Sequence, residues 1–453
     1  MRILQIVHGL PYFTQAGTEI YAHNLSLELS KKHEIYMFSR LCDLKQNDYS
    51  LTKETIGGFV VYLINNTFMD CESFQMLYEN ESIDKKFEDI LEEIKPDIVH
   101  IHHLIFLSIG LIKKIKEKGI PIVFTLHDYW LMCPRWHVLK KNAKVCEKFT
   151  LGKFNQECLV CLNELLNIKK ESKKIYNFIK RFLPAFMLTW LKKIYFSLAG
   201  IIYNNDNNIH KLRERVSRIK DLMESIDIFL APSEFIRDRY IEFGIPQEKI
   251  KLSRYGLNTD LFNELQKNKN DKLRFAFVGT LLPAKGVDVL IKSFNKIKDQ
   301  NAELMMYGVL KSYIGFEHYL PYLRKILKNK NIKFMGGFDN CQIASVFQNI
   351  DVLVVPSIWP ENSPLVIQEA FLFRTPVIAS RIGGIMELVQ EGLGGLLCNP
   401  GDVKDLRDKI QYLIDNRNVI DELKENMPRA KSMEENAREI EDIYGQLLLA
   451  GKR

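Results

Sequence analysis

Short apolar runs rich in β-branched residues alternate with segments of helical spacing along most of the chain. In the first half we expect strands at residues 3–7, 34–38, 59–63, 98–101, 122–126 and 228–231. Between the first two strands, Ile20, Leu25 and Leu29 follow the spacing of one helix face, which predicts a helix over residues 19–29. Strands and helices that alternate in this way are typical of a parallel α/β sheet.

A second series of the same kind begins after a turn-rich stretch at residues 255–258. Its expected strands are residues 274–278, 304–307, 332–335, 352–355 and 377–379. Its expected helices are residues 286–298, 317–328, 341–347, 364–372 and 403–416, and a last helix is expected at 434–449. The pattern predicts an α/β fold of two domains, residues 1–255 and 256–430, followed by a helical C-terminal segment at 431–453.

Residues 133–220 interrupt the regular pattern, and we interpret them as an insertion in the first domain. The insertion begins with a cysteine-containing stretch and continues with lysines that are interleaved with aromatic residues between Lys169 and Tyr195. This lysine-rich part has two interpretations. Its helices pack their aromatic side chains on the first domain, or they form an amphipathic surface that contacts anionic lipid.

The cysteines of the insertion are candidates for a metal site. They are Cys133, Cys146, Cys158 and Cys161. The last two are separated by two residues, a spacing that structural zinc sites use. Because no secretory signal is apparent, we do not expect a disulfide framework. The four thiols therefore predict either a structural zinc site or ordinary buried thiols.

Composition and charge narrow the class of protein. Of 453 residues, 46% are hydrophobic and 26% are charged, which is typical of a globular protein. The net charge of +7 is too small to indicate a nucleic-acid partner, but it suits an anionic ligand or membrane surface. A strand starts almost at Met1, and Lys192 and Lys193 divide the longest apolar stretch. We therefore expect a cytoplasmic protein that acts at the inner face of the membrane.

The loop after the fourth strand of the second series carries the most specific chemical signal. Glu361 lies in this loop, Pro364 opens a helix, and Glu369 follows in the early turns of that helix. Proline suits the first helical position, where an N–H has no partner. Since proline has no N–H, the amides of Leu365 and Val366 are expected to bind a diphosphate at the positive end of the helix. The Glu369 carboxylate can then accept from ribose hydroxyls.

Three further positions fit an anionic nucleotide ligand. Gly279, Thr280 and Lys285 lie in the turn after the first strand of the second series, where a glycine allows close backbone approach and an ammonium can bind phosphate oxygens. Gly17 opens the first helix and offers backbone N–H groups in the same way. The alternative for Lys285 is a solvated loop lysine.

His127 is the candidate catalytic residue of the first domain. It follows the strand at 122–126, where a neutral imidazole could hydrogen-bond a sugar hydroxyl or move a proton, and the alternative is a structural histidine. His100 and His102 alternate onto one strand face but lack a carboxylate partner for a metal site. The dinucleotide fingerprint G-x-G-x-x-G is absent after the first strand, which argues against a dehydrogenase.

The spacing of Glu361 and Glu369 resembles the E-x7-E motif of family 4 retaining glycosyltransferases, and residues 380–387 resemble the segment that follows this motif. The resemblance extends along nearly the whole chain outside the insertion. It implies the GT-B fold, in which two Rossmann-like domains face each other across a cleft. The N-terminal domain would bind the acceptor, the C-terminal domain would bind the nucleotide-sugar donor, and the last helix would pack back on the first domain.

The same resemblance implies roles for single residues. Glu361 would face the donor sugar, Glu369 would hold the ribose, and Lys285 would bind the diphosphate. His127 would touch the donor sugar near the acceptor, and the loop at Gly17 would border the phosphates.

Two positions depart from the family pattern. Pro364 stands where the family often has glycine, and Thr280 stands where it usually has arginine. Lys285 is therefore the main positive charge expected at the diphosphate. The chain contains no D-x-D sequence, which metal-dependent transferases usually show, so we expect no metal or other cofactor for catalysis.

We therefore predict a retaining, metal-independent glycosyltransferase of polysaccharide biosynthesis. It would move a sugar from a nucleotide-sugar donor to a hydroxyl of a glycan or lipid-linked glycan. The acceptor would attack from the face that the nucleoside diphosphate leaves, with a covalent intermediate on Glu361 as the competing route. A nucleotide-sugar epimerase of the same fold and a non-catalytic sugar-nucleotide-binding subunit stay open as alternatives.

Overall fold

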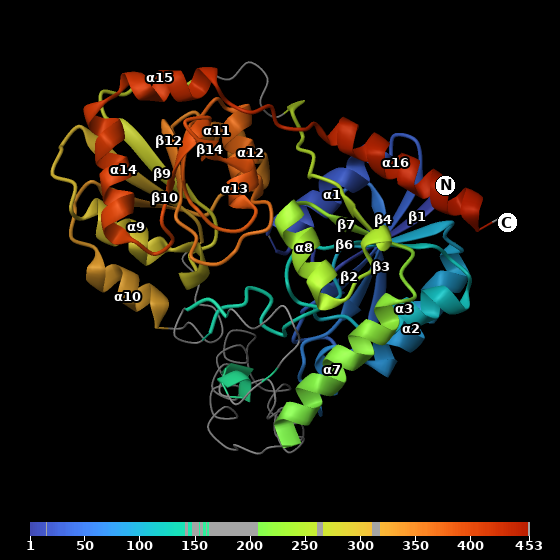
Figure 1. Cartoon of the computed structure of the whole chain (residues 1–453). Helices are drawn as coiled ribbons and strands as arrows, with labels where there is room; N and C mark the ends of the chain where they lie inside the picture. The colour runs from blue at the N-terminus through green and yellow to red at the C-terminus, as the bar shows by residue number, and fades with distance from the viewer. Residues whose placement is uncertain are drawn as a thin grey trace.

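Two α/β units, each with a mostly parallel sheet between layers of helices, make up the chain (Figure 1). The computed structural model describes residues 1–14, 16–140, 144–146, 154, 157–159, 161–162, 207–260, 266–309 and 318–451. The strands of the first sheet fall within residues 2–252, and those of the second fall within residues 273–398. The prediction of two Rossmann-like sheets is confirmed.

The first sheet contains eight strands in the order β3-β4-β2-β1-β5-β6-β7-β8. They are β1 (Arg2–Val7), β2 (Glu34–Leu41), β3 (Leu51–Ile56), β4 (Phe59–Asn65), β5 (Ile98–Ile101), β6 (Ile122–Thr125), β7 (Ile228–Ala231) and β8 (Ile250–Leu252). All neighbours pair in parallel except β3 and β4. All predicted strands of this sheet are present. The two edge strands β3 and β8 were missed, because β3 is largely exposed and β8 has three residues.

Helices cover both faces of the first sheet. One face carries α2 (Glu81–Ile94), α3 (Gly110–Glu117), α7 (Asn207–Met223) and α8 (Glu234–Phe243). The other face carries α1 (Gly17–Leu29) and α16 (Met433–Ala450). Figure 1 shows α16 next to α1 in the first domain. Ile440 and Tyr444 of α16 are fully buried in the same apolar cluster as Ile3 and Tyr21. The last helix of the chain is thus part of the core of the first domain.

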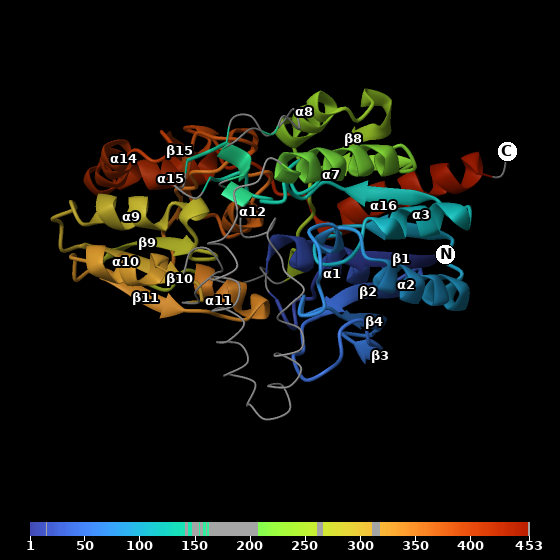
Figure 2. The same ribbon diagram turned by 90° about the horizontal axis from the view of Figure 1, so that it is seen from below.

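The second sheet contains seven strands in the order β11-β10-β9-β12-β13-β15-β14. They are β9 (Leu273–Val278), β10 (Ala302–Tyr307), β11 (Ile332–Gly336), β12 (Val352–Val355), β13 (Val377–Ser380), β14 (Gln390–Glu391) and β15 (Gly394–Cys398). One face carries α9 (Val287–Phe294), α10 (Tyr319–Ile326), α14 (Val403–Asp415) and α15 (Asn418–Glu425). The other carries α11 (Ile343–Phe347), α12 (Leu365–Leu372) and α13 (Ile385–Leu388). Figure 2 shows this domain from below, with α9 and α11 on opposite sides of the sheet.

The chain passes between the domains twice, and the two passages are hydrogen-bonded to each other. Leu257 N–H donates to the carbonyl of Lys431 at 3.0 Å, and Met433 N–H donates to the carbonyl of Leu257 at 2.7 Å. A Cβ at Gly256 would lie 2.5 Å from the carbonyl oxygen of Ser432. Glycine is therefore required where the two passages approach each other most closely.

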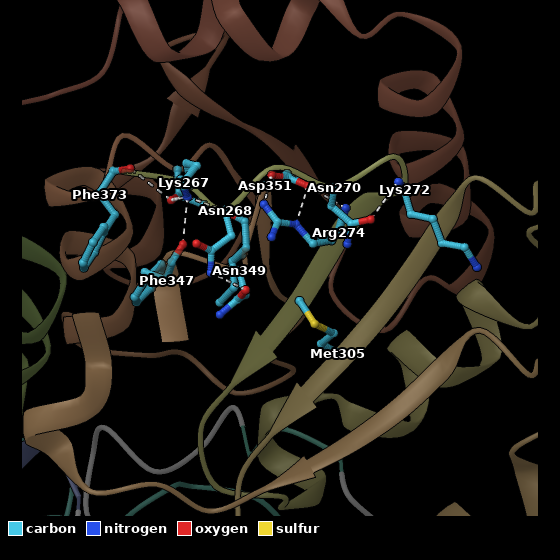
Figure 3. Close-up of polar contacts among 12 residues, drawn as sticks. Lys267, Asn268, Asn270, Lys272, Arg274, Met305, Phe347, Asn349, Asp351 and Phe373 are labelled. Atoms are coloured by element: carbon cyan, nitrogen blue, oxygen red, sulfur yellow. Dashed lines mark hydrogen bonds and ion pairs between the residues drawn. The ribbon is translucent and has the colours of Figure 1, made fainter. Parts of the chain in front are cut away.

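A partly buried lysine, Lys267, fixes the first passage to the second domain (Figure 3). Lys267 Nζ donates to the carbonyl of Phe347 at 3.1 Å, and also to the carbonyl of Ile350 and to Thr375 Oγ1. Its three hydrogens are thus all used. Burial lowers the pKa of Lys267 to about 7, because the ammonium has exchanged water for this small set of oxygens.

The predicted insertion differs from its expected extent. Residues 207–220 lie in α7, whose Leu212, Val216 and Ile219 are buried in the first core, so this helix belongs to the domain itself. The segment from Lys169 to Lys193 lies outside the described residues. Among the described residues, no helix has the length and apolar composition needed to cross a membrane.

Candidate active site

The functional residues predicted in the second domain lie where neighbouring parallel strands end. β9 pairs with β12 through Phe275–Val352 and Ala276–Leu353. The chain after β9 forms the short 3-10 helix η5 (Pro283–Lys285), and the chain after β12 carries Glu361 and then α12. Parallel strands have their carboxyl ends at one edge of the sheet, which is where ligands of such folds bind.

Lys285 and Glu361 form an ion pair at this edge. The distance from Lys285 Nζ to Glu361 Oε1 is 2.6 Å, and Ser357 Oγ donates to the same oxygen at 2.7 Å. The Glu361 side chain is 5% exposed, whereas that of Lys285 is 30% exposed. The ammonium also lies 5.6 Å from the centre of the Trp359 ring. A buried carboxylate is thus neutralised, and the cation that neutralises it remains accessible to a second anionic ligand.

Glycines hold the Glu361 loop from two sides. Gly286 has a φ of 66°, and a Cβ there would lie 1.8 Å from the carbonyl oxygen of Pro356. Gly384 N–H donates to the Glu361 carbonyl at 2.8 Å, and a Cβ on Gly384 would lie 1.6 Å from the carbonyl oxygen of Asn362. No side chain fits at either position, so the loop packs directly against backbone.

The helix after this loop begins one residue later than expected. Pro364 has a ψ of 117°, so it is the N-cap, and α12 starts at Leu365. The prediction of Pro364 as the first helical residue is wrong. The first N–H groups of a helix have no intrahelical acceptor, which leaves the amides of Leu365 and Val366 as donors at this end. Glu369 lies further along α12 and is buried, and burial raises its pKa to about 7.

The glycine loop of the first domain faces the same helix. α1 begins at Gly17, where a Cβ would lie 3.8 Å from Leu365 Cδ1. Gly279, at the end of β9, has a φ of 148°, and its N–H donates to the carbonyl of Tyr307 at 3.0 Å. Thr280 follows directly and is partly exposed. The structure thus brings Gly17 near Leu365 across the two domains and keeps Gly279 and Thr280 in the turn that leads to Lys285.

His127 is buried inside the first domain, and both of its ring nitrogens are hydrogen-bonded. Nδ1 lies 2.6 Å from Tyr255 Oη, and Nε2 lies 3.2 Å from Nδ1 of His102. His102 Nε2 in turn lies 2.8 Å from the amide oxygen of Gln5. Burial lowers the pKa of both histidines well below its usual value, so both are neutral. Since Gln5 accepts, His102 donates from Nε2, His127 donates to His102, and the Tyr255 hydroxyl donates to His127.

A second histidine stands nearer the domain surface, and it was not among the residues predicted for the site. The His8 side chain is 17% exposed, its Nε2 lies 3.4 Å from Glu19 Oε1, and its ring centre lies 4.7 Å from that of His103. His103 Nε2 lies 3.1 Å from Asp128 Oδ2. His8 directly follows β1, and strand-end position is the signal that could have identified it, as it did His127.

Direct hydrogen bonds join the domains beside these residues. Asn362 Nδ2 donates to the carbonyls of Leu126 at 2.9 Å and His127 at 3.1 Å, and Ser233 Oγ donates to Asn362 Oδ1 at 2.7 Å. The residue that follows Glu361 thus contacts the strand end that carries His127. No sequence pattern indicates this contact, because the two segments are 235 residues apart.

A carboxylate of the second domain also binds a helix start of the first. Glu387 accepts from the N–H groups of Glu234 at 2.9 Å and Phe235 at 2.8 Å, at the beginning of α8. A carboxylate is stabilised by the free N–H groups and the positive end of a helix. We call the contacts of Ser233, Asn362 and Glu387 the interdomain latch.

The predicted zinc site is not supported. Among the described residues, no group of three or more His, Cys, Asp or Glu side chains is arranged to hold a metal ion. Cys133, Cys158 and Cys161 instead pack against the apolar core of the first domain, and Cys146 is partly buried. Burial raises the pKa of Cys133 to about 12, as expected for a thiol among apolar side chains.

Known protein families match nearly all of the chain. Residues 16–261 match the model of Glycosyltransferase Family 4, and residues 259–439 match the model of Glycosyl transferases group 1. An uncharacterized protein of the cps region of Klebsiella pneumoniae is 23% identical over 73% of this chain and 68% of its own length. An uncharacterized glycosyltransferase of Methanocaldococcus jannaschii is 32% identical over 41% of this chain and 51% of its own length.

Solved structures share the fold. Sucrose-phosphate synthase from Thermosynechococcus elongatus superposes with a TM-score of 0.65 at 18% identity, covering 99% of both chains. The Anabaena HepE protein in complex with UDP and glucose gives a TM-score of 0.62 at 17% identity, also over 99% of both chains. The likeness to these structures extends over both sheets of this chain. With the Glu361–Glu369 loop and helix at the edge of the second sheet, the chain belongs to the family 4 glycosyltransferases, enzymes that use nucleotide-sugar donors.

Proposed function

We propose that the protein transfers a sugar, with retention at the anomeric carbon, from a nucleoside diphosphate sugar to a hydroxyl of a glycan or lipid-linked glycan. The Lys285–Glu361 ion pair beside the start of α12 is the observation that carries the proposal. In this proposal the ion pair supplies a cation, and the start of α12 supplies free amides, for the leaving diphosphate. The Anabaena HepE protein, which shares the fold, binds UDP together with glucose, and this supports a uridine donor.

In this proposal the diphosphate lies against Lys285 and the amides of Leu365 and Val366. Charge that develops on the leaving phosphate is then stabilised by groups already in position, which is the largest catalytic contribution expected in such a site. Glu369, one turn further along α12, would accept from the ribose hydroxyls. A hydroxyl donor favours the charged carboxylate, so donor binding would lower the raised pKa of Glu369.

The proposed roles of Glu361 and His127 follow from their hydrogen bonds. Glu361 Oε1 is already occupied by Lys285 and Ser357, which suits a carboxylate that orients a sugar hydroxyl better than one that attacks the anomeric carbon. We therefore favour attack by the acceptor hydroxyl on the face that the diphosphate leaves, with a departing phosphate oxygen taking the proton. Both nitrogens of His127 bond within the protein, so His127 would act here by positioning the loop that borders the acceptor.

The decisive experiment is a transfer assay with UDP-sugars and a panel of glycan acceptors, read by mass spectrometry. Glycosylated acceptor with the anomeric configuration of the donor supports the proposal. A new epimer from donor alone would indicate the epimerase alternative. Binding of UDP-sugar without any product would indicate the non-catalytic alternative. A covalent sugar adduct on Glu361 would overturn the direct front-face route.

The setting of the reaction is a separate part of the proposal. A role in polysaccharide assembly at the inner face of the membrane is proposed from the family resemblance and from the lysine-rich segment, and this segment lies outside the described residues. Sedimentation with vesicles of anionic lipid at low salt tests it, and a protein that stays in the supernatant contradicts it.

A further inference from the structure

An arginine packs against a pair of touching aromatic rings at the carboxyl end of β2, with the ring centres of Phe68 and Phe106 5.6 Å apart and nearly perpendicular. The guanidinium carbon of Arg40 is 4.6 Å from the centre of the Phe106 ring and 5.3 Å from that of Phe68. Its Nε donates to the carbonyl of Asn66 at 2.7 Å. Phe68 follows β4 and Phe106 follows β5, so three strand ends of the first sheet contribute to this cluster.

Both phenylalanines have a backbone conformation that bulky residues rarely adopt. Phe68 has a φ of 63° and Phe106 has a φ of 69°. Such conformations are costly for a residue with a large side chain, and they persist only where the surroundings impose them, most often at functional sites. The buried side chain of Asn66 imposes both. Its Nδ2 donates to the Phe106 carbonyl at 2.8 Å, and its Oδ1 accepts from Phe68 N–H at 3.1 Å.

The charge of Arg40 is not matched by a carboxylate. In the part of the chain that the structure describes, no acidic oxygen lies within ion-pair distance of it, and Nε is its one hydrogen-bonded nitrogen. Burial lowers the pKa of Arg40, and Cys42 and Asp48 oppose this shift only as smaller electrostatic influences. Both Asp48 oxygens accept backbone N–H groups, from Thr67 at 2.6 Å and Asp70 at 3.0 Å. The terminal guanidinium nitrogens therefore have N–H donors available for a ligand.

The cluster adjoins the proposed active site from the acceptor side. The Phe106 ring lies 6.1 Å from the ring of His8, and His8 lies 3.4 Å from Glu19 of α1. α1 begins at Gly17, which faces Leu365 at the start of α12. Contacts through Phe106, His8 and Glu19 thus connect Arg40 to the helix whose first residue faces the proposed diphosphate position, on the side of the first domain.

We infer that Arg40, packed against Phe68 and Phe106, binds an oxyanion of the acceptor, either a phosphate ester or a sugar carboxylate. A guanidinium presents two parallel N–H donors that match the oxygens of a phosphate or carboxylate, and a fixed side chain loses little freedom when it binds. The two rings contact each other and cover adjoining sides of the guanidinium, so its other sides stay open to a ligand. This inference names the acceptor class and so rests on the proposed transfer function.

The test is calorimetric titration of the full-length protein at low salt, with and without saturating UDP. The probes are methyl phosphate, the methyl glycoside of glucuronic acid, and uncharged methyl glucoside. The variants are Arg40→Gln, which removes the charge, and Arg40→Lys, which keeps the charge but removes the paired donors. Arg2→Gln is the matched control, because Arg2 is a partly buried arginine in the same sheet whose Nη1 donates to the backbone carbonyl of Ile94.

We expect the wild-type protein with UDP to bind one of the two anions at least tenfold more tightly than methyl glucoside. Arg40→Gln should weaken this binding about tenfold or more, Arg40→Lys should weaken it less, and Arg2→Gln should leave it within twofold. A preference for methyl phosphate indicates a phosphorylated acceptor, and a preference for the glucuronide indicates a uronic acid. Thermal unfolding of each variant shows whether it has folded. If Arg40→Gln does not fold, the comparison of Arg40→Lys with the wild type carries the test.

Three results would overturn the inference: neither anion binds the wild-type protein, methyl glucoside binds as tightly as the anions, or the Arg40 variants bind the anion as the wild type does. A failure of the proposed transfer function is detected by separate measurements, namely nucleoside diphosphate binding and the transfer assay. If wild-type protein binds no nucleoside diphosphate and transfers no sugar, the transfer proposal fails, and anion binding at Arg40 is still measured without UDP.

Discussion

The two sides of the active site are built in different ways. On the side of the second domain, Lys285, Ser357 and Glu361 come from two adjoining loops and neutralise one another in a small buried network. On the side of the first domain, Arg40 carries a charge that no described carboxylate matches and is held by two strained phenylalanines. On the proposed donor side, the Lys285 and Glu361 charges are thus paired within the protein, and the Lys285 ammonium stays accessible. On the proposed acceptor side, Arg40 still has N–H donors available for a ligand.

This difference teaches which part of the site is general and which is specific. In the proposed function the Lys285–Glu361 network would contact only the phosphates of the donor, so it would serve any nucleoside diphosphate. An unmatched cation costs stability unless a ligand neutralises it, so it is retained where recognition needs it. The predictions below test this contrast in order of decreasing effect.

Removal of Lys285 should have the largest effect. Lys285→Ala leaves Glu361 buried without its cation and the leaving diphosphate without its positive charge, so kcat/KM should fall by about 10²–10³-fold. Steady-state transfer assays measure this. Lys292→Ala is the control, since Lys292 pairs with Asp288 in the neighbouring helix α9 and should leave kcat/KM within twofold.

The double variant Lys285→Ala, Glu361→Gln sharpens the result. It removes the buried charge together with its partner, so thermal stability should recover while activity stays low. If activity returned with stability, Lys285 would be a structural residue, and the donor side would no longer be an electrostatic site.

Gly384→Ala should disrupt the Glu361 loop. A Cβ at this position would lie 1.6 Å from the carbonyl oxygen of Asn362, so the backbone has to move, and we expect a loss of about 3 kcal/mol in the free energy of unfolding. Urea unfolding measures it. Gly445→Ala in α16, where a Cβ meets nothing within 4 Å, should instead be neutral or stabilising. Equal losses in the two variants would contradict the close packing described for the loop.

The raised pKa of Glu369 predicts a pH dependence of stability. Burial raises this pKa from 4.5 to about 7, so between these values the folded protein binds a proton that the unfolded chain releases. The contribution of Glu369 to stability is therefore fully present below pH 4.5 and is lost as pH rises through 7. Wild type should lose about 2 kcal/mol relative to Glu369→Gln between about pH 5 and pH 7. A difference between the two proteins that stays constant with pH would show that Glu369 is not desolvated.

The interdomain latch should show the smallest effect. Glu387→Ala removes the acceptor of two N–H groups at the start of α8, which should cost about 1 kcal/mol locally. Hydrogen exchange of the Glu234 and Phe235 amides should accelerate about fivefold. Glu242→Ala is the control on the same helix, since Glu242 pairs with Arg239 on its exposed side. Unchanged exchange at Glu234 would mean that water replaces Glu387 without loss.

The sequence was informative where chemistry and structure are local. Glu361, Pro364 and Glu369 lie within one loop and helix, and Lys285 lies in one turn, so their positions after strand ends could be predicted from the sequence, while their roles were implied by the family resemblance. The sheet order was not predicted, although most strands were, because apolar runs reveal strands and not their neighbours. Pro364 was assigned one position too far into the helix, since proline is tolerated both at the N-cap and at the first helical residue.

The acceptor side could not be predicted in this way. Arg40, Asn66 and Phe106 are brought together only by the order of the strands in the sheet, and single residues after β-strands show no periodic pattern. Glu387 was noticed within a family-like segment, but its partner helix α8 was not expected. The zinc site failed for a related reason, because close spacing of Cys158 and Cys161 does not reveal whether the thiols point toward each other or toward an apolar core.

The two bonded passages between the domains have a mechanical consequence. The two passages lie side by side at Gly256 and Ser432. A relative movement of the domains would therefore be a hinge rotation about this crossing. Glu387, whose carboxylate lies 3.7 Å from Nη2 of Arg254, and Asn362, which bonds the carbonyl of His127, hold the domains together close to this crossing. An opening of the domains would then require the interdomain latch and the hydrogen bond from Tyr129 Oη to the Pro360 carbonyl to part, while the core between α1 and α16 could stay intact throughout the cycle.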